Sequence, residues 1–161
     1  VWRWKDEPPY RILEPSAGTG NLSRRCVESV EAGAGPNHVD CIEIQPELAD
    51  QLRQQGIYRS VHAGDFLAVQ PVPVYDRVVM NPPFDRERDI DHVVHALKFL
   101  RPGGRLVSIM SAGTEFRETR KSTVFRELID GLGGTWRDLR PGSFASVGTY
   151  VNTIVLSVVN R

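Results

Sequence analysis

The tetrapeptide Asn81-Pro82-Pro83-Phe84 is the stretch whose residue types most clearly suggest chemistry. It directly follows the apolar run Tyr75–Met80, which has the composition of a buried parallel strand. The tetrapeptide should therefore lie at the carboxyl end of a strand, the edge where open α/β sheets bind ligands. Two consecutive prolines remove two backbone donors and fix φ near about −65°. This pattern predicts a rigid site in which an amide and an aromatic ring grip a planar amine or amide group.

The elements that must position this site alternate between short β-branched runs and helical stretches, as in a doubly wound α/β domain. Strands are predicted at Arg11–Glu14, His38–Glu43, Ser60–Ala63, Tyr75–Met80 and residues 105–110. Helices are predicted at residues 21–32, from Pro46 up to Gly56, and at residues 90–100 and 124–132. Residues 101–104 should form a turn, and residues 113–121 a loop or a loosely held helix start. The last two predicted strands, residues 135–139 and 150–159, suit an antiparallel edge hairpin on an otherwise parallel sheet.

Composition predicts one ordinary globular domain, because 161 residues with 40% hydrophobic and 25% charged side chains fit that class. Twenty basic residues balance twenty acidic ones, so net charge indicates no broad nucleic-acid surface, although a local basic rim would suffice. No apolar run approaches the roughly 20 residues of a membrane span, and no signal peptide is visible. We therefore expect a cytoplasmic protein without a membrane partner. Cys26 and Cys41 lack metal or redox spacing and are predicted to be buried, reduced core residues.

The turn between the first strand and the first helix contains Gly18 and Gly20. Glycine permits positive φ and close backbone approach, and the following helix offers free N–H groups at its start. A Gly-x-Gly turn is a weak signal by itself. This one lacks the third glycine of the dinucleotide fingerprint and the Gly-Lys-Ser/Thr of a P-loop.

Two carboxylates follow at the ends of the next two strands. Glu43 lies 23 residues beyond Gly20, where it could accept hydrogen bonds from both hydroxyls of a ribose. Asp65 could accept one from the exocyclic amine of adenine, with Phe66 stacking near the ring. The alternatives are a strand-end acid in solvent for Glu43 and an Asx turn or helix cap for Asp65. Two carboxylates without a cationic phosphate clamp favour a positively charged nucleoside cofactor over a dinucleotide.

These motifs resemble those of class I S-adenosylmethionine-dependent methyltransferases over residues 10–160. The sequence from Leu13 to Gly20 is similar to the first motif of that family, in the Glu-Pro-Ser-Ala-Gly form of DNA amino-methyltransferases. Asn81-Pro82-Pro83-Phe84 resembles the catalytic motif of enzymes that methylate planar nitrogens, most closely DNA N6-adenine methyltransferases of phage or mobile-element type. The resemblance implies a Rossmann-like methyltransferase fold, S-adenosylmethionine as cofactor and no metal.

The resemblance also implies roles for individual residues. The catalytic set would be Asn81, Pro82, Pro83 and Phe84. The cofactor would be contacted by Glu14, Pro15, Ser16, Ala17, Gly18, Thr19, Gly20, Asn21, Glu43, Ile44, Asp65, Phe66 and Asn81.

The implied reaction is methyl transfer to the exocyclic amine of a nucleobase, most strongly adenine N6 in DNA. The side-chain oxygen of Asn81 and the carbonyl of Pro82 would each accept a hydrogen bond from one N–H group of the amine and so localise its lone pair. Phe84 would stack on the base, a contact typically contributing ~1–3 kcal/mol. A base in duplex DNA would have to be flipped out first. No Pro-Cys pair is present, which argues against carbon-5 cytosine methylation.

Three other functions stay open. The first is methylation of adenine N6 or guanine N2 in RNA, where the same tetrapeptide occurs. The second is protein glutamine methylation, less favoured because that group typically has Tyr at the last motif position. The third is an inactive S-adenosylmethionine-binding module that supports a partner. We expect residues 1–161 to form a single methyltransferase domain lacking an N-terminal segment and a target-recognition domain, so that a partner subunit or further domain would read the nucleic acid.

Several other residues give weaker predictions. His92 and His95 are expected to be surface or half-buried helix residues, since no third metal ligand is evident. The segment that follows the fifth strand could contact phosphates or remain a solvated loop, through Arg117, Arg120, Lys121 and Arg126. Residues 144–149 are predicted to fold over the substrate opening. Three tryptophans are predicted to pack rather than to stack on bases, namely Trp2, Trp4 and Trp136.

Overall fold

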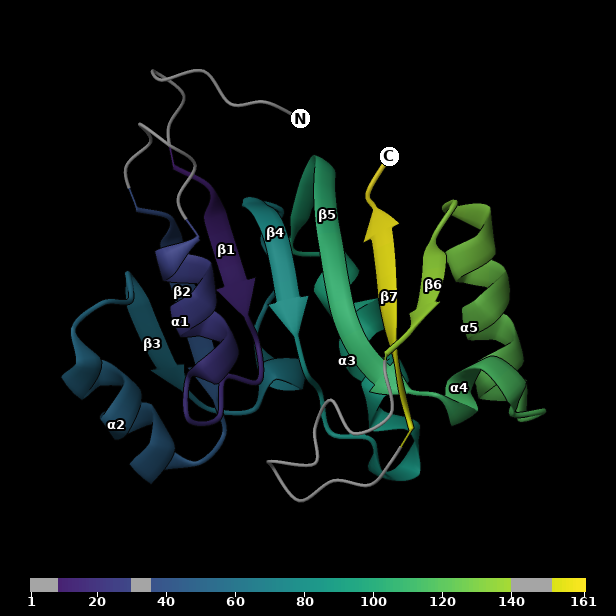
Figure 1. The fold of residues 1–161 in the computed structure, drawn as a ribbon, viewed down its shortest axis with the longest axis horizontal. Coiled ribbons are helices and arrows are strands. Elements are labelled where there is room, and N and C mark those ends of the chain that lie inside the picture. The colour runs from purple at the N-terminus through teal and green to yellow at the C-terminus, as the bar shows by residue number, and fades with distance from the viewer. Residues whose placement is uncertain (1–8, 30–35, 140–151) are drawn as a thin grey trace.

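The computed structural model describes residues 9–29, 36–139 and 152–161, which build a seven-stranded sheet in the order β3-β2-β1-β4-β5-β7-β6 (Figure 1). The strands are β1 (Arg11–Glu14), β2 (His38–Glu43), β3 (Ser60–Ala63), β4 (Tyr75–Met80), β5 (Leu100–Ser111), β6 (Thr135–Asp138) and β7 (Thr153–Val159). β7 pairs antiparallel with both β5 and β6, and the other strand pairs of this sheet are parallel. The predicted doubly wound, mostly parallel sheet with an antiparallel C-terminal strand pair is confirmed.

Helices cover both faces of the sheet. They are α1 (Asn21–Glu28), α2 (Pro46–Gln55), α3 (Arg88–Leu97), α4 (Gly113–Phe116) and α5 (Arg120–Gly131), with 3₁₀ turns η1 (Phe66–Ala68) and η2 (Asp85–Glu87). In Figure 1, α1 and α2 lie in front of the sheet and α3 lies behind it. None of the helices in the described ranges is both long and apolar enough to cross a bilayer.

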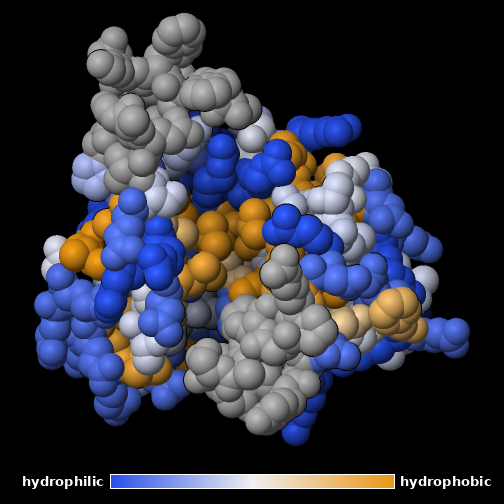
Figure 2. Space-filling model, viewed as in Figure 1, coloured by the Kyte–Doolittle hydropathy of each residue, from blue (hydrophilic) through white to orange (hydrophobic). Residues whose placement is uncertain are grey.

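The core is divided between these two faces because successive side chains of a strand point in opposite directions. Ile12 of β1 packs in a cluster with Val39 and Leu52, on the side of α1 and α2. Leu13, the next residue of β1, belongs to a larger cluster that contains Ile90 and Phe125 from α3 and α5. On the front face, apolar residues gather near the centre of the view, to the right of α1 (Figure 2).

The connections between strands reverse direction at β1. From β1 the chain moves outward through β2 to β3, and it then returns to the other side of β1 to form β4 and β5. The carboxyl ends of β1 and β4 therefore flank the point where the strand order switches. In open α/β sheets ligands bind in the crevice at this point. The segment after β1, which carries Gly18 and Gly20, and the tetrapeptide after β4 both begin there.

Most predicted elements are confirmed, and the differences come from tertiary contacts. β5 begins at Leu100, so the predicted turn at residues 101–104 is wrong: Leu100 pairs with Tyr75, and Gly103 donates a hydrogen bond to the carbonyl of Asn160. The predicted helix at residues 90–100 instead begins at Arg88 and ends at Leu97.

β7 lies between β5 and β6, so of the two C-terminal strands only β6 is an edge strand, opposite to β3 at the other edge of the sheet. The last helix begins at Arg120, four residues before the predicted start, because the Thr119 side chain caps it by accepting from the Ser122 N–H. The predicted loop at residues 113–121 therefore contains the short α4 and the first residues of α5. α1 ends at Glu28 with Ser29 as its non-helical C-cap, earlier than predicted, and residues 30–32 of the predicted helix lie outside the described residues.

Candidate active site

A cavity of about 440 Å³ opens beside the switch point, within the range of roughly 300–1,000 Å³ typical of small-molecule sites. Seven predicted site residues line it: Pro15, Ser16, Glu43, Ile44, Asp65, Phe66 and Pro83. The remaining lining residues are Gln45, Gly64, Leu67, Arg88 and His92. The structure thus brings residues of the first motif, both strand-end acids and one residue of the tetrapeptide to a single cavity. The other predicted residues are Glu14, Ala17, Gly18, Thr19, Gly20, Asn21, Asn81, Pro82 and Phe84, which lie outside its lining.

Glu43 is held rigidly at the end of β2. Its side chain is 5% exposed, so the alternative of a strand-end acid in solvent is wrong. One carboxylate oxygen accepts from the Gly18 N–H at 2.7 Å and the other from the Gln45 N–H at 2.9 Å. An ionised carboxylate has about four acceptor positions, so roughly two stay free for ribose hydroxyls. That role stays a prediction, supported by the position of Glu43 in the cavity wall.

The turn after β1 depends on the two glycines. Gly18 has φ +54° and Gly20 has φ +84°, a region that L side chains rarely adopt. Space is open where a Cβ of Gly18 would lie, whereas a Cβ of Gly20 would come within 2.6 Å of the Tyr58 hydroxyl. The turn is closed by the Gly20 N–H, which donates to the carbonyl of Ala17 at 2.8 Å. Gly20 therefore lets α1 pack closely on the end of α2, and Gly18 leaves room beside the cavity.

Asp65 and Phe66 follow β3. One oxygen of Asp65 accepts from the Leu67 N–H at 2.9 Å and caps η1, so the predicted helix cap is confirmed. Asp65 is nevertheless exposed and lines the cavity, and its second oxygen has no hydrogen-bond partner among the described residues. Phe66 lines the cavity but is 2% exposed and packs on His95 and Phe99 in the core, so little of its ring is open to a ligand.

The tetrapeptide after β4 combines buried and free groups. Pro82 is buried, and Pro83 and Phe84 are half-buried. Asn81 is exposed, and no described residue forms a hydrogen bond with its side chain. Because Pro83 also lines the cavity, the exposed amide of Asn81 stands two residues from the cavity wall.

Glu14 lies beneath the turn instead of facing the cavity. It is 2% exposed, and one of its carboxyl oxygens has no hydrogen-bond partner in the described structure. Burial raises the pKa of Glu14 to about 8, partly offset by hydrogen bonds from Ser23. Cofactor contact by Glu14 stays a prediction.

His92 is one of the cavity residues that the sequence analysis did not assign to the site. The expectation of a surface or half-buried residue is wrong for His92, which is 8% exposed, while His95 is half-buried. His92 Nδ1 lies 3.4 Å from the Ser16 hydroxyl, and burial lowers the pKa of the imidazole. A sequence signal existed: residues 89, 92, 93 and 96 follow helical spacing and are all buried.

The charges around the cavity favour a cation. Glu43 and Asp65 contribute carboxylates to the wall, whereas the guanidinium of Arg88 is paired with Asp85 at 2.7 Å. The lowered pKa of His92 keeps this imidazole neutral near pH 7. The two carboxylates therefore give the cavity a negative potential, which favours a positively charged ligand. Among the described residues no cluster of His, Cys, Asp and Glu could hold a metal ion.

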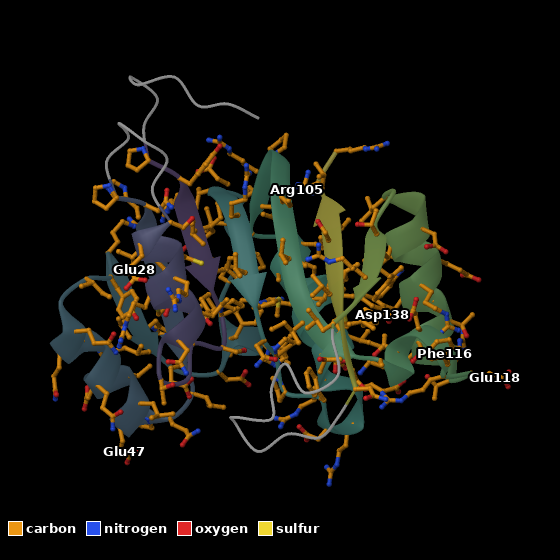
Figure 3. The ribbon with its side chains drawn as sticks, viewed as in Figure 1. Glu28, Glu47, Arg105, Phe116, Glu118 and Asp138 are labelled. Atoms are coloured by element: carbon orange, nitrogen blue, oxygen red, sulfur yellow. The ribbon has the colours of Figure 1, made fainter. Side chains whose placement is uncertain are left out.

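The basic segment after β5 is largely engaged within the protein. Lys121 pairs with Asp91 at 2.7 Å, and Arg126 donates to the carbonyls of Thr114 and Arg117. Arg120 is exposed and has no partner among the described residues, so phosphate contact by this segment stays a prediction. Phe116, labelled in Figure 3, is 77% exposed on α4 and was not identified from the sequence.

Other weak predictions have mixed outcomes. Trp136 packs edge-on against Phe125, as predicted. Cys41 is buried and Cys26 only partly, and both are free thiols. Trp2, Trp4 and residues 144–149 lie outside the described residues. A larger groove of about 780 Å³ between α3 and α5 contains none of the predicted catalytic or cofactor residues.

Comparison with solved structures identifies the architecture. A type I restriction-modification methyltransferase subunit from Streptococcus thermophilus has a TM-score of 0.80 and 18% identity, covering 98% of this chain and 41% of its own. A protein from Listeria monocytogenes assigned to the class I S-adenosylmethionine-dependent methyltransferases has a TM-score of 0.76 and 16% identity, covering 97% of this chain and 55% of its own. The chain has the class I methyltransferase fold.

A predicted O-methyltransferase from Agrobacterium tumefaciens has the same fold, with a TM-score of 0.68 and 18% identity, covering 96% of this chain and 75% of its own. This chain spans about half of the Listeria protein and less than half of the Streptococcus subunit. No family model and no curated protein matches the sequence. At these identities the likeness concerns the methyltransferase fold, and the site must be argued from its own residues.

Proposed function

We propose that this chain binds S-adenosylmethionine in the cavity and transfers its methyl group to an exocyclic amine of a nucleobase, foremost adenine N6 in DNA. One observation carries the proposal: the rigid tetrapeptide after β4 adjoins a cavity with two carboxylates in its wall. Pro83 belongs to both features, and Asn81 holds a free amide next to them. A cofactor site and an acceptor site therefore adjoin at the switch point of the sheet.

The residues of the cavity fit an adenosine that carries positive charge. Glu43 has free acceptor positions for ribose hydroxyls because only one backbone N–H reaches each of its oxygens. The second oxygen of Asp65 is available to an exocyclic amine, and Ile44 and Pro83 provide apolar contacts for a purine. The space beside Gly18 allows a ligand to approach the backbone. Unlike a dinucleotide site, the wall contains no unpaired guanidinium for a phosphate, since Arg88 is paired with Asp85.

The cofactor, when bound, supplies an electrophilic methyl group on a sulfonium. The chain's own task is to make a poor nucleophile reactive. The side-chain oxygen of Asn81 and the carbonyl of Pro82 each accept a hydrogen bond from one N–H group of the amine. These two hydrogen bonds draw the amine nitrogen toward tetrahedral geometry and localise its lone pair. Phe84 holds the base by stacking, and positioning the amine in line with the methyl group is then the main catalytic effect. The nitrogen would form its bond to the methyl carbon as the sulfur–methyl bond breaks to leave a neutral thioether, and the resulting acidic ammonium would release its proton to water, so no strong base is required.

DNA is favoured as the substrate by the motif form and by one neighbour. The Streptococcus thermophilus protein is a restriction-modification methyltransferase subunit, whereas the Agrobacterium protein is a predicted O-methyltransferase. Because the same fold serves different acceptors, the tetrapeptide is the feature that selects an amine. We propose that a partner subunit or a further domain recognises the nucleotide sequence of the target.

The test is transfer of labelled methyl groups from S-adenosylmethionine to DNA, RNA and protein, with the methylated nucleosides identified by mass spectrometry. We expect N6-methyladenine in DNA, and at least a hundredfold loss of rate in Asn81→Ala, the size of effect typical for a removed transition-state hydrogen bond at about 10²–10³. Cofactor affinity of Asn81→Ala should change far less. Gln54→Ala is the matched control, since it removes another exposed carboxamide, on α2.

Each result has a defined reading. Transfer to DNA that survives Asn81→Ala would refute the mechanism. Methylation of RNA alone would replace DNA by the RNA alternative, and cofactor binding without transfer to any polymer would support the inactive module. Absence of cofactor binding would refute the proposed function as a whole.

A further inference from the structure

His92 joins the two halves of the site. It lies on α3, which begins four residues after Phe84, and its Nδ1 faces the Ser16 hydroxyl of the turn after β1 at 3.4 Å. Its ring packs on Phe66 with 5.6 Å between centroids. Nε2 has no hydrogen-bond partner among the described residues, although the imidazole is 8% exposed and forms part of the cavity wall.

We propose that His92 determines the specificity of the cavity for a sulfonium: the neutral imidazole admits the positively charged cofactor, and the protonated imidazole rejects it while tolerating the neutral thioether product. This inference rests on the proposed function. Its basis is the position of His92 in the same wall as Glu43 and Asp65, whose negative charge a protonated imidazole would partly cancel. Repulsion between imidazolium and sulfonium adds to this loss, because both charges would share a partly enclosed site.

The groups around His92 set its charge. Burial has the largest influence and lowers the pKa of His92. Asp65, from the segment after β3, and Asp91, from α3, raise the pKa, while Arg88 and His95 of α3 lower it. The turn after β1 faces the ring with the uncharged Ser16. Because burial prevails, the protein at neutral pH presents an uncharged imidazole to the cavity.

The sign of the pH dependence follows from proton linkage. A cation that binds only the form with neutral His92 must release one proton from the imidazole whenever the pH is below the pKa that His92 has in the free protein. The Kd of S-adenosylmethionine should then rise by up to about tenfold per pH unit below that pKa. S-adenosylhomocysteine differs by the missing methyl group and the missing sulfonium charge, so its Kd should rise much less. Between about pH 5 and 7 the ligand's own amino and carboxyl groups keep their charge.

The experiment measures the Kd of both ligands by calorimetry from pH 5 to pH 7 on the purified chain. We expect the Kd of S-adenosylmethionine to rise toward low pH with a limiting slope of up to about tenfold per pH unit, and the Kd of S-adenosylhomocysteine to rise with a clearly smaller slope. His92→Asn keeps an amide group near the Nδ1 position but cannot titrate, so it should abolish the difference between the ligands. His95→Asn is the matched control, because His95 bonds the Val69 carbonyl and lies outside this cavity. It should preserve the difference.

Equal pH dependence for the two ligands, or a slope that persists in His92→Asn, would overturn the inference and leave the proposed function intact. Failure of the wild-type chain to bind either ligand at pH 7 would instead overturn the proposed function. A second readout covers the case in which His92→Asn does not fold. In a proton NMR titration of the wild-type chain, S-adenosylmethionine should lower the pKa of His92 more than S-adenosylhomocysteine does, and equal shifts would contradict the inference.

Discussion

Replacing Gly20 by alanine should destabilise the chain more than the same replacement at Gly18. Both glycines have positive φ, +84° and +54°. An L side chain in this region costs roughly 1–2 kcal/mol per residue, so both variants share a strain of about this size. The two positions differ in the space that a methyl group would enter.

The difference can be worked out from the surroundings of each Cβ. At Gly20 it would lie 2.6 Å from the Tyr58 hydroxyl and 2.7 Å from Leu52 Cδ2, and Leu52 is fully buried. Such overpacking typically costs about 1–3 kcal/mol. At Gly18 nothing lies within 4 Å. We therefore expect losses of roughly 2–5 kcal/mol for Gly20→Ala and roughly 1–2 kcal/mol for Gly18→Ala.

The assay is urea denaturation of the ligand-free chain, with the slope m compared between variants so that midpoint shifts report stability. Thermal unfolding gives a second measure, because a domain of this size loses about 2–4 °C in Tm per kcal/mol. Equal losses in the two variants would refute the reasoning, since strain alone would then account for both. A Gly20→Ala variant as stable as the wild type would show that α1 and α2 can separate at no cost.

Two further predictions concern buried carboxylates. Asp40→Asn should lower the free energy of unfolding by about 1–3 kcal/mol at pH 7. Burial alone would raise the pKa of Asp40, but hydrogen bonds from Arg59, Ser60 and Tyr75 hold this pKa below its usual range. The stabilisation by the ionised carboxylate is lost on protonation, so urea titrations should show the difference shrinking as the pH falls below about 4. In the same assay Glu14→Gln should be more stable than the wild type at pH 8 and similar to it at pH 4. Burial raises the pKa of Glu14 from 4.5 to about 8 in the folded state, so the folded wild type is destabilised relative to the unfolded chain as the pH rises from 4.5 to 8, whereas a glutamine has no such pH dependence.

The sequence was sufficient for the first four strands because each is a short segment with β-branched or other apolar residues that lies between glycine, proline or polar turns. It failed where distant contacts override such local signals. Arg101-Pro102-Gly103-Gly104 has the composition of a turn, yet pairing of Leu100 with Tyr75 and a hydrogen bond to Asn160 place it within β5. Likewise, α3 is preceded by Arg86 and Glu87 at φ 51° and 57°. No residue-type preference predicts left-handed backbone at an arginine and a glutamate.

The site was predictable to the extent that strand ends determine it. Parallel strands bring their carboxyl ends to one edge, so Glu43 at the end of β2 and Asp65 just after β3 had to approach the turn after β1. His92 could not be predicted with equal certainty, because its burial depends on how α3 packs against Ser16 and Phe66. The state of Glu43 was also hidden: only the folded turn shows that backbone donors from Gly18 and Gln45 fix its carboxylate.

The fold gives no guidance on the acceptor of the methyl group, and our proposal takes that choice from the tetrapeptide. An exocyclic amine has two N–H donors, whereas a hydroxyl has one. Asn81 and Pro82 offer two acceptors at adjacent positions, one on a side chain without another described partner and one on a carbonyl held between prolines. An amine satisfies both, while a hydroxyl would leave one acceptor unpaired once water is excluded, at a cost of roughly 1–3 kcal/mol. If the chain acts as we propose, that penalty, about 5- to 150-fold in rate, would favour nitrogen over oxygen as the acceptor of the methyl group.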